Sequence, residues 1–270
     1  MPILRIGTTI PGYTTVVPTS SSATPFRTTE VSAEVFAQQS IDANPAEVDR
    51  VIDEVTQEFA MHADVTSDAL HRAVRAEVAL RELVTATGAI AGTLNCHVEQ
   101  IRGNPKNGIA PCLALGRLTS QGVPFTCTGD VLTAVAMAVV KSLGHPTFYH
   151  EVEAIDFDAN EAILANTGEY DRGLCTDRPE LVPNTWFTDD DIVGPCALFS
   201  IPAGPASLIA YVMAPNPRFV VAQGSFTGRQ SPDTGTPNAG FRFANDTAAS
   251  AWQRWAGAGV THHSVATNAQ

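Results

Sequence analysis

Three short stretches of the sequence carry side chains that could do chemistry. Thr126–Asp130 joins a strand-like apolar run to a helix-like run, and Glu151 and Glu153 lie two residues apart in a strand-like run. His262 and His263 are adjacent and lie close to the last residue. Carboxylates and imidazoles from separate segments are the oxygen and nitrogen ligands that Mn²⁺ and similar divalent cations accept. The Glu and His stretches could therefore supply ligands to a metal ion, if the fold brings them together.

Each of these side chains also has an ordinary structural explanation. Asp130 suits the N-cap of the helix expected after it. Glu151 and Glu153 point to one face of a strand, which is common beside water. On an apolar face, however, a carboxylate needs a partner or a metal. On an extended segment only one of His262 and His263 faces inward, and histidines often serve as polar surface or hydrogen-bonded core residues.

The cysteines give a weaker signal. They are Cys96, Cys112, Cys127, Cys175 and Cys196. No CxxC motif occurs among them, which disfavours a zinc-ribbon or thioredoxin-like site. Buried free thiols in a reducing compartment are the expected state. Cys127 is singled out because its loop should face the active site. His150 alternates with Glu151, so it points to the opposite face and no role is expected for it.

Alternating helix and strand patterns must position the Thr126–Asp130 loop. Ile3–Ile6 is an apolar strand, and Asn44 followed by Pro45 marks a helix start. Ser67 is expected to cap a second helix that ends at Gly88. Two further strands are expected at 89–96 and 123–128, and two further helices at 109–122 and 131–144. The Ser/Thr-rich tract 14–29 should be an irregular loop.

Strand-like patterns dominate after Gly144. Phe148–Phe157 and Glu161–Asn166 flank a short polar turn, which predicts a hairpin. Further strands are expected at 197–201, 208–213 and 219–223, and a helix at 247–255 should precede the His pair. The sequence thus predicts an α/β domain with a doubly wound parallel sheet over residues 1–145. A mostly antiparallel, β-barrel-like domain should follow over residues 146–270.

The overall composition limits the class of protein. The 270 residues include 28 acids and 16 bases, for a net charge of −12, and no run of Lys or Arg occurs. This charge disfavours a nucleic-acid-binding surface. No stretch of ~18 apolar residues predicts a membrane span, and the first residues do not resemble a signal peptide. We therefore expect a soluble, cytoplasmic protein.

Taken together, Gly122–Met137, Phe148–Gly168 and Gly259–Val265 resemble the catalytic part of the L-fucose/L-arabinose isomerase superfamily in order and spacing. The resemblance extends from about Leu4 to Gln270. It implies the central and C-terminal domains of that family. The first Rossmann-like domain and the final helix of its longer members are expected to be absent.

The resemblance assigns roles to individual residues. Glu151 corresponds to a metal-binding acid of the family and is also expected to be catalytic, together with Asp130. The last metal ligand corresponds to His263, with His262 as the alternative. Thr128 stands where the family has a metal-binding Glu, so it is expected to contact substrate instead.

Two further positions are expected to contact substrate. Asn166 stands where the family has a metal-binding His, and Cys127 lies next to Thr128 in the same loop. The tract Gly224–Phe243 resembles the family's stretch before its last helix. It is rich in glycine and hydroxyl groups, so a substrate-facing loop and a plain surface loop are both consistent with it.

The function implied is that of an aldose–ketose isomerase acting on a small sugar or polyol. In the family, a divalent cation binds O1 and O2 of the open-chain sugar, and a carboxylate moves a proton between C1 and C2 through a cis-enediol. Because two ligand positions have changed, we expect a partly degenerate Mn²⁺ site.

Two other functions remain open. One is a non-catalytic sugar-binding or partner subunit that keeps the isomerase fold, and the other is a lyase or epimerase with the same enediolate chemistry. The family also implies a homo-oligomer, or a partner chain that supplies the missing domain.

Overall fold

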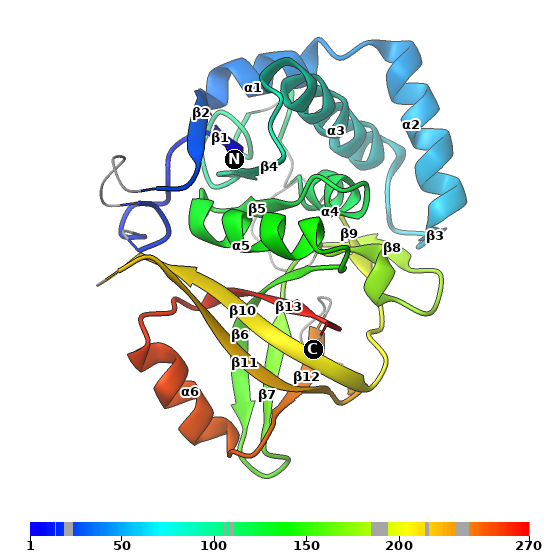
Figure 1. Cartoon of the computed structure of the whole chain (residues 1–270). Helices are drawn as coiled ribbons and strands as arrows, with labels where there is room; N and C mark the ends of the chain where they lie inside the picture. The colour runs from blue at the N-terminus through cyan, green and yellow to red at the C-terminus, as the bar shows by residue number, and fades with distance from the viewer. Residues whose placement is uncertain are drawn as a thin grey trace.

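The structure of the chain is a computed structural model that describes residues 1–13, 15–18, 24–104, 106–108, 111–184, 194–213, 216–229 and 238–269. Within these residues, a four-stranded parallel sheet with helices is followed by a closed six-stranded antiparallel barrel (Figure 1). The predicted fold class is therefore confirmed. None of the described helices is long and apolar enough to cross a membrane.

The parallel sheet brings three loops to one edge. Its strands are β1 (Pro2–Ile6), β2 (Arg27–Val31), β4 (Ala91–Leu94) and β5 (Phe125–Cys127). Their order is β2-β1-β4-β5, and all run in the same direction. The loops after β1, β4 and β5 therefore meet beyond the same ends of the strands. There the Asn95 amide donates to Thr8 O over 2.5 Å, and the Ile10 N–H donates to Thr128 O over 3.4 Å.

The barrel places residues from distant parts of the chain side by side. Its strands are β6 (Phe148–Asp156), β7 (Glu161–Ala165), β10 (Gly204–Val212), β11 (Arg218–Phe226), β12 (Asn238–Phe243) and β13 (His263–Thr267). They pair in the order β10-β11-β12-β7-β6-β13, and β13 closes the barrel onto β10. Helix α6 (Ala248–Gly257) precedes β13, and a small separate sheet contains β3 (Ala60–Met61), β8 (Glu180–Pro183) and β9 (Pro195–Leu198).

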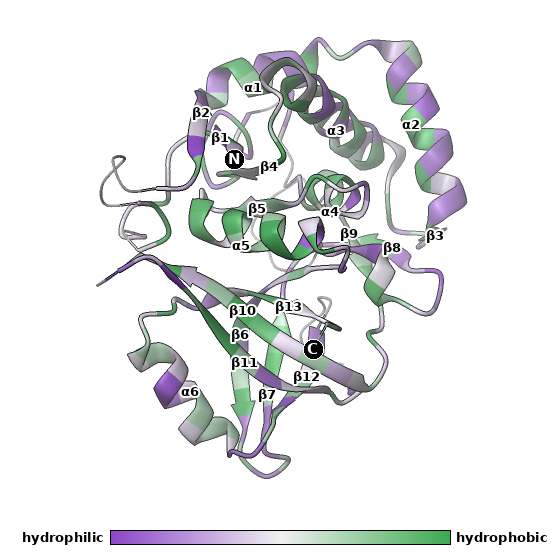
Figure 2. Cartoon of the chain, viewed as in Figure 1, coloured by the Kyte–Doolittle hydropathy of each residue, from purple (hydrophilic) through white to green (hydrophobic). Residues whose placement is uncertain are grey.

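Helix α5 holds the sheet against the barrel. The helices of the first half are α1 (Ala33–Ile41), α2 (Pro45–Glu58), α3 (Ser67–Thr87), α4 (Cys112–Ser120) and α5 (Val131–Ser142). Figure 1 shows α1 and α3 on one side of the parallel sheet and α5 on the other, next to the barrel. Helix α5 contacts β4 and β5 as well as β10 and β13. It is hydrophobic over most of its surface (Figure 2), as expected for a helix buried on two sides.

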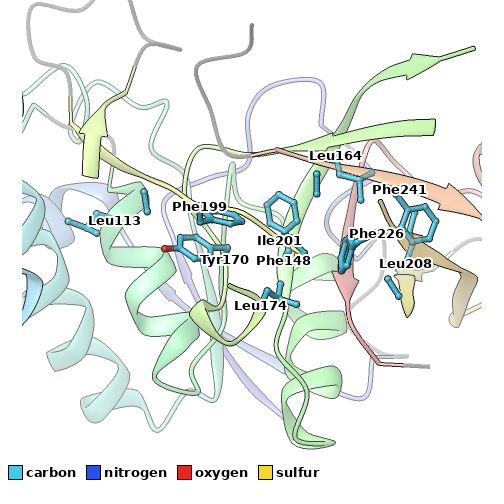
Figure 3. Packing of buried hydrophobic residues seen from close by; sticks show 14 of the residues in the cluster. Leu113, Phe148, Leu164, Tyr170, Leu174, Phe199, Ile201, Leu208, Phe226 and Phe241 are labelled. Atoms are coloured by element: carbon cyan, nitrogen blue, oxygen red, sulfur yellow. The ribbon is translucent and has the colours of Figure 1, made fainter. Parts of the chain in front are cut away.

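Alternation along β6 and β13 directs one face into the barrel and the other toward the parallel sheet. Phe148 packs with Leu164 and Phe241 inside the barrel (Figure 3). Tyr149 and Val265, by contrast, belong to the hydrophobic cluster of the parallel sheet. Glu151 and His263 alternate in step with Tyr149 and Val265, so their side chains also face the parallel-sheet half.

The structure departs from the sequence predictions in several places. The loop predicted over 14–29 is wrong at its end, because Arg27–Val31 forms β2; residues 14 and 19–23 lie outside the described residues. Strand β2 lies at the edge of the sheet and its side chains are exposed, so no apolar alternation in the sequence marks it. Helix α1 was also not predicted from the sequence. Thr66, and not Ser67, caps α3, and its hydroxyl accepts from the Ala69 N–H. The strand predicted at 197–201 is β9, shifted to Pro195–Leu198.

A buried ion network joins helices α2, α3 and α4. The Arg117 side chain is 3% exposed and donates to Glu77 over 2.8 Å and to Glu54 over 3.0 Å. Glu77 is fully buried and also accepts from Arg81 over 2.6 Å. The network therefore compensates a carboxylate that has no access to water.

We expect Arg117→Met to lower the free energy of unfolding by about 3 kcal/mol, because it removes one partner of a buried ion pair. Arg50→Met is the matched control, since Arg50 pairs with Glu47 and Glu54 at the surface. Its effect should be much smaller, because water screens an exposed ion pair. Urea denaturation of both variants measures the difference, and equal losses would contradict the argument from burial.

Candidate metal centre

Glu151 and His263 meet because β6 and β13 pair in register. The two residues lie directly opposite each other, and opposite residues of an antiparallel pair share a face. His263 Nε2 donates to Glu151 Oε1 over 3.0 Å. The imidazole is fully buried, whereas the Glu151 side chain is 30% exposed. The pair therefore lies at the boundary between the interior and solvent.

His262 joins this pair because the chain bends just before β13. The possible ligand atoms of Glu151, His262 and His263 all lie within 4.8 Å of one another, and these residues are called the Glu–His–His group below. Only His263 is buried, as expected for a single inward-facing histidine, but the bend also brings a ring nitrogen of the half-buried His262 close to the same point. Burial and the charge of His263 lower the pKa of His262, which favours the neutral ring that binds cations. The Tyr13 ring meets that of His262 at a centroid distance of 5.2 Å.

Asp130 approaches His263 from the other half of the chain. Its Oδ1 accepts from the Thr133 N–H over 2.8 Å at the start of α5. Its Oδ2 accepts from the Thr133 hydroxyl over 2.7 Å and lies 2.9 Å from His263 Nδ1. Asp130 is therefore a helix cap, as its position in the sequence indicates, and at the same time the partner of His263.

A tight turn after β5 sets the position of Asp130. The Asp130 N–H donates to Cys127 O over 3.1 Å, and Thr128 and Gly129 between them have φ values of 62° and 81°. Two positive φ angles in sequence are typical of a type I′ turn. A residue with a branched Cβ at positive φ is strained, at a cost of about 1–3 kcal/mol. Such strain is commonly found at functional sites.

The charge of His263 is set by two carboxylates. Its Nε2 faces Glu151, and its Nδ1 lies 2.9 Å from both Asp130 Oδ2 and Tyr149 Oη. Burial alone would lower the pKa of His263, but the hydrogen bonds to Asp130 and Glu151 outweigh it and raise the pKa to about 9. Burial raises the pKa of Glu151, yet the hydrogen bond and charge of His263 lower it overall. The protonated imidazole thus bridges two carboxylates.

The side chains expected to bind substrate lie outside the Glu–His–His group. Thr128 Oγ1 is buried and lies near the Tyr149 hydroxyl without meeting hydrogen-bond geometry. The Cys127 thiol donates to Tyr149 Oη over 3.9 Å, and burial raises its pKa well above the ordinary value. Asn166 is buried and accepts from the Thr167 N–H over 2.6 Å. In the part of the chain that the structure describes, no hydrogen bond joins these three side chains to the group.

A bulge separates Glu153 from Glu151. The register of β6 and β7 shifts between residues 152 and 154, so Glu153 is the extra residue of the bulge and is exposed. His150 points into the barrel, as its alternation with Glu151 predicts, and lies 3.0 Å from Ser264 Oγ. Burial lowers the pKa of His150 to about 3, which keeps the ring neutral.

A cavity of about 210 Å³ lies beside Asp130 and His263. Thr133 and Thr261 add hydroxyl groups to its wall, which is otherwise mainly apolar. Glu151 and His262 do not line it, so the cavity reaches the Asp130 side of His263 and not the Glu151 side. The described residues of the tract Gly224–Phe243 do not line it either, and residues 230–237 of this tract lie outside the described residues.

Sequence reasoning missed three residues near this site. Tyr149 shares the face of Glu151, and strand alternation could have found it. Tyr13 and Glu169 come from irregular segments, and no local pattern marks them. Glu169 is fully buried, and both its carboxylate oxygens have no hydrogen-bond partner among the described residues. Burial raises the pKa of Glu169 to about 7.

The Glu–His–His group offers one carboxylate and two imidazoles, provided that a bound cation displaces the Nε2 proton of His263. This donor set fits Mn²⁺, Fe²⁺ or Zn²⁺. Asp130 contacts the far nitrogen of His263, and such carboxylates orient the ring of a metal-binding histidine. The group supplies three ligands from the protein, so the remaining positions of a cation would be available to substrate or water.

One known protein family matches a segment of the chain that ends just before the barrel strands begin. Residues 27–146 match the family described as the L-arabinose isomerase central domain. No curated protein matches the chain. The matched segment contains the Cys127–Asp130 turn and helix α5, and it ends before the Glu–His–His group begins.

Asp130→Ala should destabilise the protein more than the loss of an ordinary helix cap does. Ser32→Ala is the control, because the Ser32 hydroxyl accepts from the Val35 N–H at the exposed start of α1. A cap alone is worth about 1 kcal/mol, and an unpaired buried polar group adds about 1–3 kcal/mol. We therefore expect losses of about 2–4 kcal/mol for Asp130→Ala and about 1 kcal/mol for Ser32→Ala in urea denaturation. Equal losses would show that the contact with His263 contributes nothing.

Proposed function

We propose that the chain is a sugar isomerase-like enzyme, because residues 27–146 match the L-arabinose isomerase central-domain family of the L-fucose/L-arabinose isomerase superfamily. One observation carries the proposal: the Glu–His–His group gathers a carboxylate and two imidazoles within 4.8 Å. Asp130, from inside the matched segment, contacts His263 of this group. The family match and the donor group are therefore parts of one site.

The residues of the site have complementary roles in this proposal. Glu151, His262 and His263 would hold a divalent cation such as Mn²⁺, which stabilises negative charge on the neighbouring oxygens of an open-chain sugar. Glu151 is partly exposed and has two oxygens, so one is available to move a proton between C1 and C2. Asp130 keeps the His263 ring in place, and Tyr13 covers the histidines.

Thr128 and Asn166 favour a second candidate function. Neither side chain can act as a base near neutral pH, and neither is hydrogen-bonded to the Glu–His–His group in the described residues. A site with fewer ligands should bind its cation weakly. The second candidate is therefore a non-catalytic sugar-binding or partner subunit. A homo-oligomer, or a complex with a partner chain that supplies a further domain, remains a prediction for either function.

We expect calorimetric titration to detect Mn²⁺ binding to the wild-type protein. Glu151→Gln and His263→Asn should each weaken it by roughly tenfold or more, equivalent to about 1.4 kcal/mol. Glu153→Gln is the matched control, because it removes the same charge two residues away on an exposed side chain. If Glu153→Gln weakens binding as much as Glu151→Gln, Mn²⁺ binds to surface charge and the proposed site is wrong.

Isotope exchange separates the two candidate functions. The protein is incubated in D₂O with Mn²⁺ and a panel of aldoses and ketoses, and deuterium at C1 and C2 is measured by NMR. An isomerase should incorporate deuterium, and Glu151→Gln should abolish the incorporation. Mn²⁺ binding without exchange on any sugar would favour the non-catalytic subunit.

Restoring the family's ligands should strengthen cation binding. Thr128→Glu and Asn166→His are expected to add ~1–3 kcal/mol each to the Mn²⁺ binding free energy, as charge-assisted contacts do. Calorimetry of the two single variants and the double variant measures this. Unchanged affinity in all three would mean that positions 128 and 166 are too far from the Glu–His–His group to contribute a ligand.

A further inference from the structure

Glu169 is a buried carboxyl group without a positively charged partner. Its side chain has no exposed area, and neither oxygen meets hydrogen-bond geometry with the described residues. Its own backbone N–H and the Cys127 thiol lie close enough to lower its pKa, but burial outweighs them and raises the pKa overall. Glu77 is equally buried but is held by Arg81 and Arg117. An ionised carboxylate that is buried without a partner is very unfavourable. Glu169 therefore needs either a proton or positive charge nearby.

Glu169 lies on the same face as the Glu–His–His group. Phe148 and Tyr170 form an antiparallel bridge, and the Tyr149 N–H donates to Glu169 O over 3.1 Å. Glu169 is thus opposite Tyr149, and opposite residues share a face. Tyr149 Oη in turn lies 2.9 Å from His263 Nδ1. The carboxyl group therefore belongs to the layer between the barrel and the parallel sheet.

The titratable neighbours of Glu169 are mostly neutral. They are Cys96, Cys112, Cys127, Cys196, Tyr149, Glu151 and His263. Burial raises the pKa values of the four thiols and of the Tyr149 hydroxyl, so these groups keep their protons. The charges that reach Glu169 from these neighbours come from the Glu–His–His group. Glu151 raises the pKa of Glu169, and His263 lowers it.

We propose that Glu169 is the buried acid of this site, which holds a proton while the Glu–His–His group is free and releases it when a divalent cation binds there. This inference rests on the proposed function for the cation. Binding releases two protons: the carboxylic acid of Glu169 becomes a carboxylate, and the imidazolium of His263 loses its Nε2 proton so that this nitrogen can bind the cation. One O–H bond and one N–H bond break, both protons go to solvent, and no electron is transferred.

The signs of the charges near Glu169 explain why cation binding should release its proton. Burial raises the pKa of Glu169 to about 7, so the acid and the carboxylate are both accessible near neutral pH. A divalent cation held by Glu151 cancels the negative charge that favours the protonated form, and its two positive charges exceed the one that His263 loses with its proton. Both changes favour the carboxylate of Glu169.

Infrared titration tests this inference directly. The carbonyl stretch of a protonated carboxyl group is measured against pH, as the difference between wild type and Glu169→Gln. The signal should be lost with a midpoint near pH 7. Saturating Mn²⁺ and Glu151→Gln should each move the midpoint down, and His263→Asn should move it up. Glu161→Gln is the control, because this buried carboxylate is already held by Arg242 and Thr227, and the signal should persist.

The outcomes separate this inference from the proposed function. No difference signal at any pH means that Glu169 is not protonated, and the inference is wrong. Mn²⁺ binding in calorimetry with an unchanged midpoint overturns the inference and leaves the cation site in place. Absence of Mn²⁺ binding overturns both. If Glu169→Gln does not fold, spectra of the wild type with and without Mn²⁺ give the same test, since bound Mn²⁺ must diminish the protonated-carboxyl signal.

Discussion

Closure of the barrel by β13 is the constraint on which the rest of the structure depends. This strand pairs with β6 on one side and β10 on the other. A shift by one residue would exchange every side chain between the two faces. In the observed register, Ala266 packs inside the barrel and Val265 packs with the parallel sheet. The same register places His263 opposite Glu151, so apolar packing farther along the strand positions the candidate metal ligands.

Helix α5 connects this register to the parallel sheet. The helix is buried against both halves of the molecule, and its N-cap, Asp130, reaches His263. A single carboxylate therefore ends the helix, orients the imidazole and joins the segment of the family match to the barrel. The two hydrophobic clusters also draw residues from both halves, since Tyr149 and Val265 pack with the parallel sheet, while Val51 and Val74 belong to the same cluster as the barrel interior.

The buried acidic residues are of two kinds, with and without a positively charged partner. Glu77 has two arginines, and Glu151 and Asp130 share the imidazolium of His263. Each of these carboxyl groups has a positively charged side chain within hydrogen-bond distance. Glu169 has no such partner among the described residues, and its protonation must therefore respond to the charge of its neighbours. The protonation of Glu169 is therefore sensitive to the charge of the Glu–His–His group, whereas Glu77 is held in its ion network with Arg81 and Arg117.

Periodicity along the sequence determined most helices, the β6–β7 hairpin and the face that Glu151 shares with Tyr149, because local spacing decides which way a side chain points. The meeting of Glu151 with a histidine was expected only from the family resemblance, and the β6–β13 register decides it in the structure. The polar edge strand β2, the bend that brings in His262 and the isolation of Glu169 have no local signal. They depend on contacts between residues far apart in the chain, so only the tertiary structure decided them.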